Sequence, residues 1–179
     1  NPASSAWWCD VADPIKLRIA YAIRARLQTI LTASGFNTNA GQRVTIGRQT
    51  IDAESELPCI TIREGETEAW ANAGKGARAL ATGGSEKVEK NTAWNIDGYV
   101  SATQATNGTQ QMLVAADIEK AMMLGTDLYE SGLRLGPIGL LGSEPFTRED
   151  GADGEGIRVK FSTHYTEKYG DPYATASQQ

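Results

Sequence analysis

The chain contains one histidine, His164, which is the first residue to consider for catalysis. It lies on the polar side of an alternating segment near the C-terminus, and no nucleophile motif surrounds it. Covalent catalysis needs a serine or cysteine beside a base that a carboxylate orients. The sequence has no Gly-x-Ser-x-Gly, and Cys59 follows a proline at the expected start of a strand. We therefore interpret His164 as an exposed strand residue and predict that the protein is not an enzyme.

Two other kinds of segment have the composition of a ligand site without its spacing. Residues 149–155 place carboxylates around a glycine turn, but the fixed positions of an EF-hand calcium loop are missing. The glycine-rich pieces at 74–76 and 83–85 do not match the Gly-x-x-x-x-Gly-Lys-Ser/Thr pattern of a phosphate-binding loop. We interpret the acidic segment as a solvated hairpin tip and the glycines as flexible loop. The sequence therefore predicts neither a metal ion nor a cofactor.

The tryptophans are more informative. Trp7, Trp8 and Trp70 lie in segments without the periodicity of a core element, and Lys75 and Arg78 follow Trp70 in the same segment. Tryptophan is frequent at the centre of protein interfaces, because one ring buries a large area at a small cost in entropy. These five residues are therefore candidates for an interface. Packing of the same segments against their own domain is the alternative.

Bulk composition limits the class of protein. The 179 residues are enough for one domain with an ordinary core. A net charge of −5 argues against a nucleic-acid-binding domain, which normally has a basic face. Cys9 and Cys59 lack metal-site spacing and a second pair, and Cys59 is expected to be a buried thiol. No apolar run approaches the ~20 residues of a membrane span, so we predict no membrane partner.

Two amphipathic helices are predicted. The first has Asp13 as its cap and Pro14 in its first position, and it runs to about Ala33. The second has Thr109 as its cap and ends near Leu124. In both, apolar residues recur at steps of three and four, which predicts one buried stripe on each helix. The stripe residues are Ile19, Ile23, Leu27, Ile30 and Leu31 in the first helix and Val114, Ile118, Ala121 and Met122 in the second.

Strands are predicted at 44–48, 57–62, 88–102 and 156–167. The last has the clearest alternation, which is typical of an antiparallel strand with one packed face. Its apolar side consists of Ile157, Val159, Phe161, Thr163 and Tyr165. The strands form hairpin-like pairs and are not joined by crossover helices. We therefore predict an α+β fold in which two helices pack on one face of an antiparallel or mixed β-sheet.

The sequence predicts an arm, a domain and a tail. Residues 1–12 are interpreted as an N-terminal arm, 13–168 as a single α+β domain and 169–179 as a polar C-terminal tail. Within the domain, 67–86 is rich in alanine, glycine and charge and has no lasting period. We expect a long exposed loop there, extending a hairpin.

The stretch 35–66, GFNTNAGQRVTIGRQTIDAESELPCITIREGE, carries a family resemblance. A helix is followed by Gly-Phe-x-Thr, by Val-x-x-Gly-Arg, and by Leu-Pro-x-Ile-x-Ile with an acidic run. This order resembles the tail terminator (tail completion) proteins of long-tailed bacteriophages. Further points of likeness are the strand at 94–99, the helix around 118–121 and the closing strand from Gly156. The N-terminal arm and the length of the loop at 67–86 depart from the family pattern.

The resemblance implies a structural virion protein that forms a hexameric ring at the head-proximal end of the tail tube. Such a ring ends tube polymerisation and offers a surface for joining the head at the neck. The implied partners are other copies of the chain, the tail tube protein, a head-tail connector or stopper protein, and a sheath protein if the tail is contractile. DNA is only passing cargo, since like charges keep it from a negative lumen wall. Assembly is expected in the bacterial host cytoplasm.

Two alternatives stay open. Another neck or tail component, such as a head-tail connector or a tube subunit, is the nearer one. A tube subunit stacks into long polymers, whereas a terminator forms only closed rings. The remote alternative is a small soluble enzyme, which needs a convergent polar site that the sequence does not reveal.

Overall fold

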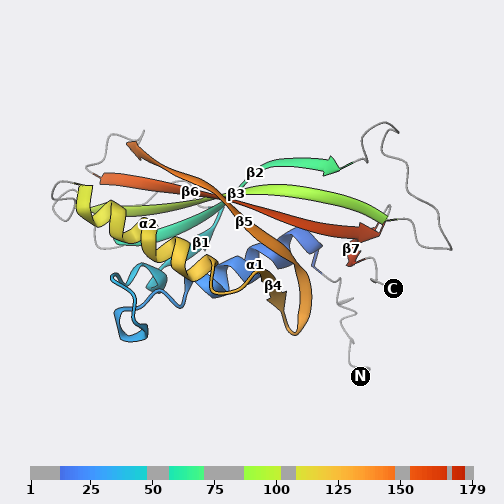
Figure 1. Ribbon diagram of the computed structural model, residues 1–179, viewed down its shortest axis with the longest axis horizontal. Helices are drawn as coiled ribbons and strands as arrows, with labels where there is room; N and C mark the ends of the chain where they lie inside the picture. Colours follow the sequence, from blue (N-terminus) through green and yellow to red (C-terminus); the bar gives the residue numbers. More distant parts are fainter. Residues whose placement is uncertain are drawn as a thin grey trace, which may run out of the picture.

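The computed structural model describes residues 13–47, 57–70, 87–101, 108–147, 154–168 and 171–175. Within these ranges the chain forms two α-helices, two short 3-10 helices and the strands of one sheet (Figure 1). In chain order they are α1 Ile15–Leu27, η1 Thr32–Ser34, η2 Ala40–Gln42, β1 Val44–Ile46, β2 Cys59–Trp70, β3 Lys87–Ser101, α2 Thr109–Met122, β4 Asp127–Glu130, β5 Leu133–Thr147, β6 Gly154–Lys168 and β7 Asp171–Thr175.

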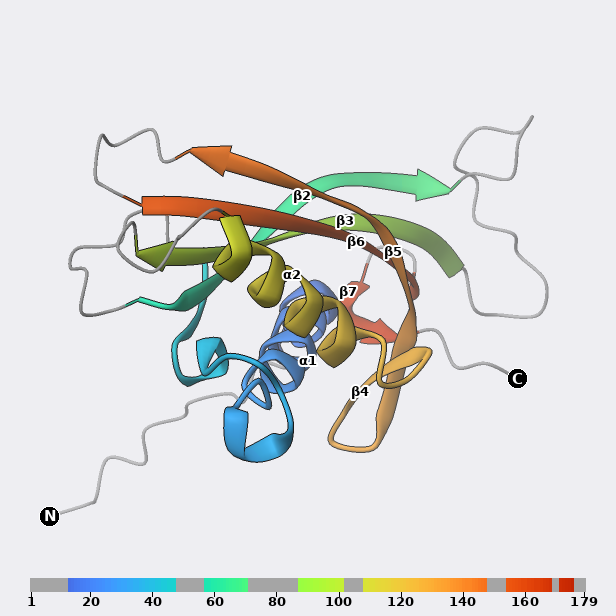
Figure 2. The same ribbon diagram turned by 60° about the vertical axis from the view of Figure 1, so that its left-hand side comes forward.

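The sheet is mixed and has the strand order β1-β2-β3-β6-β5-β4, with β7 paired to β6. β1 runs parallel to β2, whereas the other strand pairs are antiparallel. Both α-helices lie on the same face of this sheet (Figure 1 and Figure 2). The predicted α+β fold, with a mixed sheet and two helices on one face, is confirmed.

The core lies between the helices and the sheet. Alternation in β6 is confirmed, because all five residues of its predicted apolar side are buried. The helices contribute their predicted stripes, except Leu31, which is only partly buried. Fully buried side chains of this core include Ile19, Ile23, Leu27, Ile60, Ile62, Ile96, Ile118 and Phe161.

Helix α1 is shorter than predicted, and its expected side-chain cap is not formed. Pro14 occupies the cap position, and no side chain caps the first turn. The helix ends at Leu27 and not near Ala33, because the next turn tightens: the Ile30 backbone N–H bonds to the carbonyl of Leu27 at 3.1 Å. The Thr29 hydroxyl also donates to the carbonyl of Arg26 at 2.7 Å. Threonine side chains compete in this way with regular helical bonds.

Helix α2 begins at Thr109 itself, and the residue in the cap position is Gly108 with φ 72°. Its C-terminal end is held by Arg26 of α1, whose Nη1 donates to the carbonyl oxygens of Met122 at 2.7 Å and Gly125 at 3.1 Å. A cation there satisfies orphan carbonyls and complements the helix dipole. The two helices are therefore fixed to each other as well as to the sheet.

The β2–β3 hairpin is longer than predicted. Residues 67–70, assigned to the loop at 67–86, continue β2 and pair with 89–92 of β3. Polar side chains support this pairing, since the hydroxyl oxygens of Thr67 and Thr92 lie 3.1 Å apart. The composition of 67–70 led to the prediction of a loop, because a strand at the end of a hairpin needs little apolar surface.

Three further strands were not predicted. Residues 127–147 form the β4–β5 hairpin, although glycines interrupt its apolar pattern. Residues 171–175, in the segment interpreted as a polar tail, form β7 against the end of β6. Among the described residues, no helix is both long enough and apolar enough to cross a membrane.

Candidate interaction surface

The face of the sheet turned away from α1 and α2 is here called the open face. No described helix packs on it (Figure 1 and Figure 2). Side chains alternate between the two faces of a strand. Because Ile96 and Val159 are buried on the helix side, odd-numbered residues of β3 and even-numbered residues of β6 belong to the open face.

A polar row crosses the open face from β1 to β5. The register aligns Thr45, Thr61, Asp97, Arg158 and Glu144 as successive cross-strand neighbours. The hydroxyl oxygens of Thr45 and Thr61 lie 3.2 Å apart. Opposite charges then follow on β3, β6 and β5. Cross-strand pairs of this kind stabilise a sheet and fix its register.

Asp97 is the centre of this row, and its side chain is 0% exposed. Arg158 binds its carboxylate with both ends of the fork, Nε to Oδ1 at 2.8 Å and Nη2 to Oδ2 at 3.2 Å. Arg63 of β2 donates to Oδ2 from the other side. A buried carboxylate is tolerated when such charge-assisted bonds satisfy it. The two arginine side chains remain about a quarter exposed, with values of 29% for Arg63 and 26% for Arg158.

Glu144 and Lys160 extend the network toward the β5 edge. Lys160 Nζ lies 2.8 Å from Glu144 Oε1, and this hydrogen bond holds the pKa of Glu144 below its ordinary value. Arg158 Nη1 lies 3.9 Å from the same oxygen. Glu144 is half exposed, so these pairs contribute little to stability. Their effect is to hold the charged groups in defined positions.

An apolar row lies next to the charged one. Cys59, Tyr99, Gly156 and Phe146 are cross-strand neighbours, and Cys59 is buried as predicted. The rings of Tyr99 and Phe146 pack edge to face with centroids 5.4 Å apart. A Cβ at Gly156 would lie 2.3 Å from the Phe146 ring, so glycine is what lets this ring lie over the strand. Arg158 stacks on the same ring at 5.2 Å.

Beyond the N-terminal end of α1, β2, β3 and β6 continue as a projection of the sheet, here called the tip (Figure 1). It consists of 66–70 of β2, 87–93 of β3 and 162–168 of β6. On its helix side, Lys90 pairs with Glu167. Tyr165, on the same side of the tip, still belongs to the apolar core, so polar contacts supplement the core here.

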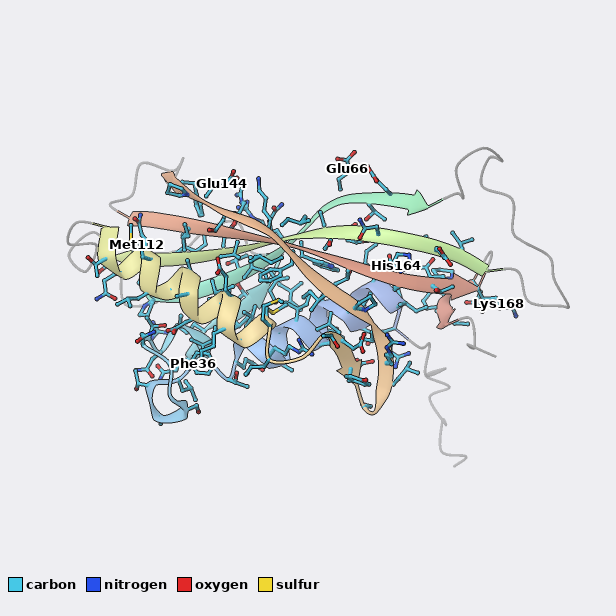
Figure 3. The ribbon with its side chains drawn as sticks, in the orientation of Figure 1. Phe36, Glu66, Met112, Glu144, His164 and Lys168 are labelled. Carbon is cyan, nitrogen blue, oxygen red and sulfur yellow. The ribbon has the colours of Figure 1, made fainter. Side chains whose placement is uncertain are left out.

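The open face of the tip is acidic. Glu66 and Glu68 are exposed, and Figure 3 shows Glu66 and Glu144 pointing away from the helices. In the strand register, Glu68 lies opposite Asn91, and Asn91 lies opposite His164. Oε2 of Glu89 lies 3.7 Å from Nε2 of His164.

The sequence-predicted residues have different outcomes. His164 lies in a strand on the polar side, as predicted, with 41% of its side chain exposed. Trp70 is the last residue of β2, opposite Glu89. Trp7, Trp8, Lys75 and Arg78 lie outside the described residues, as do Cys9 and most of the acidic segment 149–155. The interface role of the tryptophans and of the two cations stays a prediction.

The Asp97 network was missed by the sequence reasoning. The available signal was a charged residue at an alternating strand position, in Asn-Ile-Asp-Gly of β3 and Ile-Arg-Val of β6. Such a signal is common on solvated strands and does not identify a partner. Only the register, which places Asp97 opposite Arg158, brings the charges together.

Comparison with known proteins gives 36 similar chains among solved structures, and two of them illustrate the similarity. No protein-family model matches the chain, and no curated protein matches it either. One similar structure is a chain of the virion of a native gene transfer agent particle, with 18% identity, a TM-score of 0.46, and coverage of 82% of this chain and 96% of that one. The other is the sheath/tube terminator of an extracellular contractile injection system in its extended state, with 12% identity and a TM-score of 0.47. That match covers 91% of this chain and 60% of the terminator's length.

Replacing Asp97 tests the network. We expect Asp97→Ala to lower the free energy of unfolding by about 1–3 kcal/mol, because two guanidinium groups lose their shared acceptor. The loss is limited because both groups reach water. Chemical denaturation measures the change, and Glu68→Ala on the same face is the matched control, with an expected change within about 0.5 kcal/mol. Equal stability of Asp97→Ala and Glu68→Ala would mean that the network has no net stabilising effect.

Proposed function

We propose that this protein is a structural subunit of a bacteriophage tail. Six copies form a closed ring at the head-proximal end of the tail tube, end its polymerisation and present a surface to the head connector. The function is steric and associative and requires no catalytic residue. DNA passes through the ring as cargo.

The observation that carries the proposal is the two-sided character of the sheet. One face is sealed by both helices, whereas the open face displays fixed charges and the sheet projects as a tip. Non-obligate protein interfaces are about as polar as the rest of the protein surface, and the placement of their charges gives them specificity. A broad face with charges held in register suits contact with other subunits better than it suits enclosure of a small substrate.

The segments that carry the sequence resemblance support the same proposal. The stretch 35–66 contains η2, β1 and the first part of β2, and β2 pairs with the 94–99 region of β3. Asn37 and Thr38, near its start, bind Asp117 of α2. The described parts of the resembling segments therefore belong to one packed unit.

A length-control experiment tests the proposal. Purified protein is added to polymerising tail tube subunits of the same phage, and tube length and end structure are measured by electron microscopy. We expect shorter tubes with an added ring at one end, and the mass of the ring gives the number of copies. Heat-denatured protein is the control. Unchanged tube lengths with no bound ring would overturn the proposal, and long polymers of this protein alone would favour a tube subunit instead.

A further inference from the structure

The open face carries opposite net charge in its middle and at its tip. The middle of the face, here called the basic centre, displays Arg63, Arg158 and Lys160, while Asp97 and Glu144 supply two negative charges. Its net charge is one unit positive. In contrast, the charged residues with described side chains on the open face of the tip are Glu66, Glu68 and Glu89, with Lys168 at the end of β6 (Figure 3). The strand position of Lys87, opposite Lys168, belongs to the same face.

The acidic character is specific to this side of the tip. On the helix side, Glu64 pairs with Lys16 at 2.6 Å and Glu167 pairs with Lys90. These carboxylates are neutralised within the chain. Glu66 and Glu68, in contrast, are exposed on the side where the basic centre also lies. The charge difference therefore marks the open face and not the whole tip.

The basic centre is suited to receive carboxylates. Asp97 occupies one side of each guanidinium group, and 29% of the Arg63 side chain and 26% of the Arg158 side chain stay exposed to water. Lys160 is 40% exposed although it contacts Glu144. Arginine offers five donors in a fixed fork, so a guanidinium that already binds one carboxylate can bind a second.

We propose that the occupant of this surface is a second copy of the chain, whose acidic tip lies on the basic centre of the first. Within one chain the two regions lie apart along the same strands, so the tip of a copy cannot cover its own centre. A tip-to-centre contact repeated from copy to copy is heterologous, and such contacts close into rings when the rotation allows. The inference rests on the proposed ring and names the contact that builds it.

The contact is predominantly electrostatic, which determines its behaviour. Charges at a polar rim act within a screening distance of roughly 8 Å at physiological ionic strength. Self-association should therefore weaken steeply as salt is raised. Single close charge pairs at protein interfaces couple by about 1.5 kcal/mol or more, which corresponds to about tenfold in the association constant.

A charge-swap experiment tests the contact. The centre variant is Lys160→Glu, and the tip variant carries Glu66→Lys with Glu68→Lys. Arg24→Glu, at an exposed position of α1 on the other side of the molecule, is the matched control. Self-association is measured by sedimentation velocity at low salt, with and without tail tubes. Far-ultraviolet circular dichroism confirms that each variant is folded.

We expect the centre and tip variants each to lose about tenfold or more in association, while Arg24→Glu associates like the wild type. An equimolar mixture of the two defective variants should assemble again, because each supplies the charge that the other lacks. Wild-type behaviour of both variants would overturn the tip-to-centre contact and leave the proposed ring intact. If the mixture of the two variants formed only closed dimers, this result would contradict the head-to-tail arrangement. A wild type that associates neither with itself nor with tubes would overturn both proposals.

Discussion

Gly136→Ala should destabilise the domain by about 4 kcal/mol, one of the largest effects of a single methyl group in this chain. Gly136 lies in β5 with φ 144°, a conformation that other residues rarely adopt. A Cβ at this position would lie 2.0 Å from the carbonyl oxygen of His164. That oxygen belongs to the backbone of β6, which is a central strand of the sheet. Relief of the clash therefore requires displacement of a whole strand and not rotation of a side chain.

Gly142 provides the control, because it lies in the same strand with nearly the same φ of 143°. A Cβ there meets no atom within 4 Å, so Gly142→Ala carries only the backbone strain, about 1–3 kcal/mol. Thermal and chemical denaturation of both variants separate strain from collision. If both variants lost the same free energy of unfolding, β5 would be able to move away from β6 without an energetic cost.

The same glycines explain why β5 could not be predicted. Sequence patterns reveal strands through alternation, and the alternation of β6 did predict its buried side correctly. In β5 glycines stand at 136, 139 and 142, and the register shifts between Leu140 and Gly142. A bulge moves the following residues to the opposite face, so the period of two is lost although the strand continues. No strand was predicted in this segment, whereas Gly136 allows β5 to approach the backbone of β6 closely.

The helices show a different limit. Their existence and buried stripes followed from apolar spacing, but the end of α1 depended on competition for individual hydrogen bonds around Thr29. Such competition is decided by a few tenths of a kcal/mol and by what packs against the turn. Periodicity therefore predicts which face of a helix is buried better than it predicts where the helix ends.

The candidate surface was the least predictable feature. Tryptophans were chosen for their general frequency at interfaces, but the described surface is organised by Asp97 and its arginines. Asp97 and Arg158 are 61 residues apart in the sequence, and only strand pairing makes them neighbours. In the sequence, a charged residue on a solvated strand has the same pattern as one at the centre of a charge network. Only the strand register distinguishes the two.

Asp117→Ala is the second substitution with a large expected effect, because its carboxylate organises the loop before β1. Asp117 lies in α2 and is 0% exposed. Its Oδ1 accepts from the backbone N–H of Asn37 at 3.1 Å and from the Asn37 amide at 2.9 Å. Its Oδ2 accepts from the backbone N–H and from the hydroxyl of Thr38, both at 2.8 Å. One side chain thus satisfies four donors of a loop that has no regular structure of its own.

We expect Asp117→Ala to lower the free energy of unfolding by about 3 kcal/mol or more, since hydrogen bonds to charged groups are worth about 1.5–3 kcal/mol each and buried donors are left unsatisfied. Asp117→Asn should lose nearly as much, because one acceptor oxygen is replaced by a donor that faces other donors. Lys120→Ala is the matched control. Lys120 binds the Gly35 carbonyl of the same loop at 2.7 Å, but it is exposed, so about 1 kcal/mol or less is expected.

Hydrogen exchange distinguishes a local from a global effect of losing Asp117. The loop at 36–39 leads into η2 and β1, and the Gly41 N–H bonds to the Ile30 carbonyl at 3.0 Å, behind the end of α1. If the carboxylate is the main anchor, its removal should speed exchange of the Thr38 N–H and of the β1 amides more than that of β6 amides, because regions open in cooperative units. Unchanged protection of β1 together with wild-type stability would mean that packing of Phe36 and Ala40, both in the core, holds the loop without Asp117.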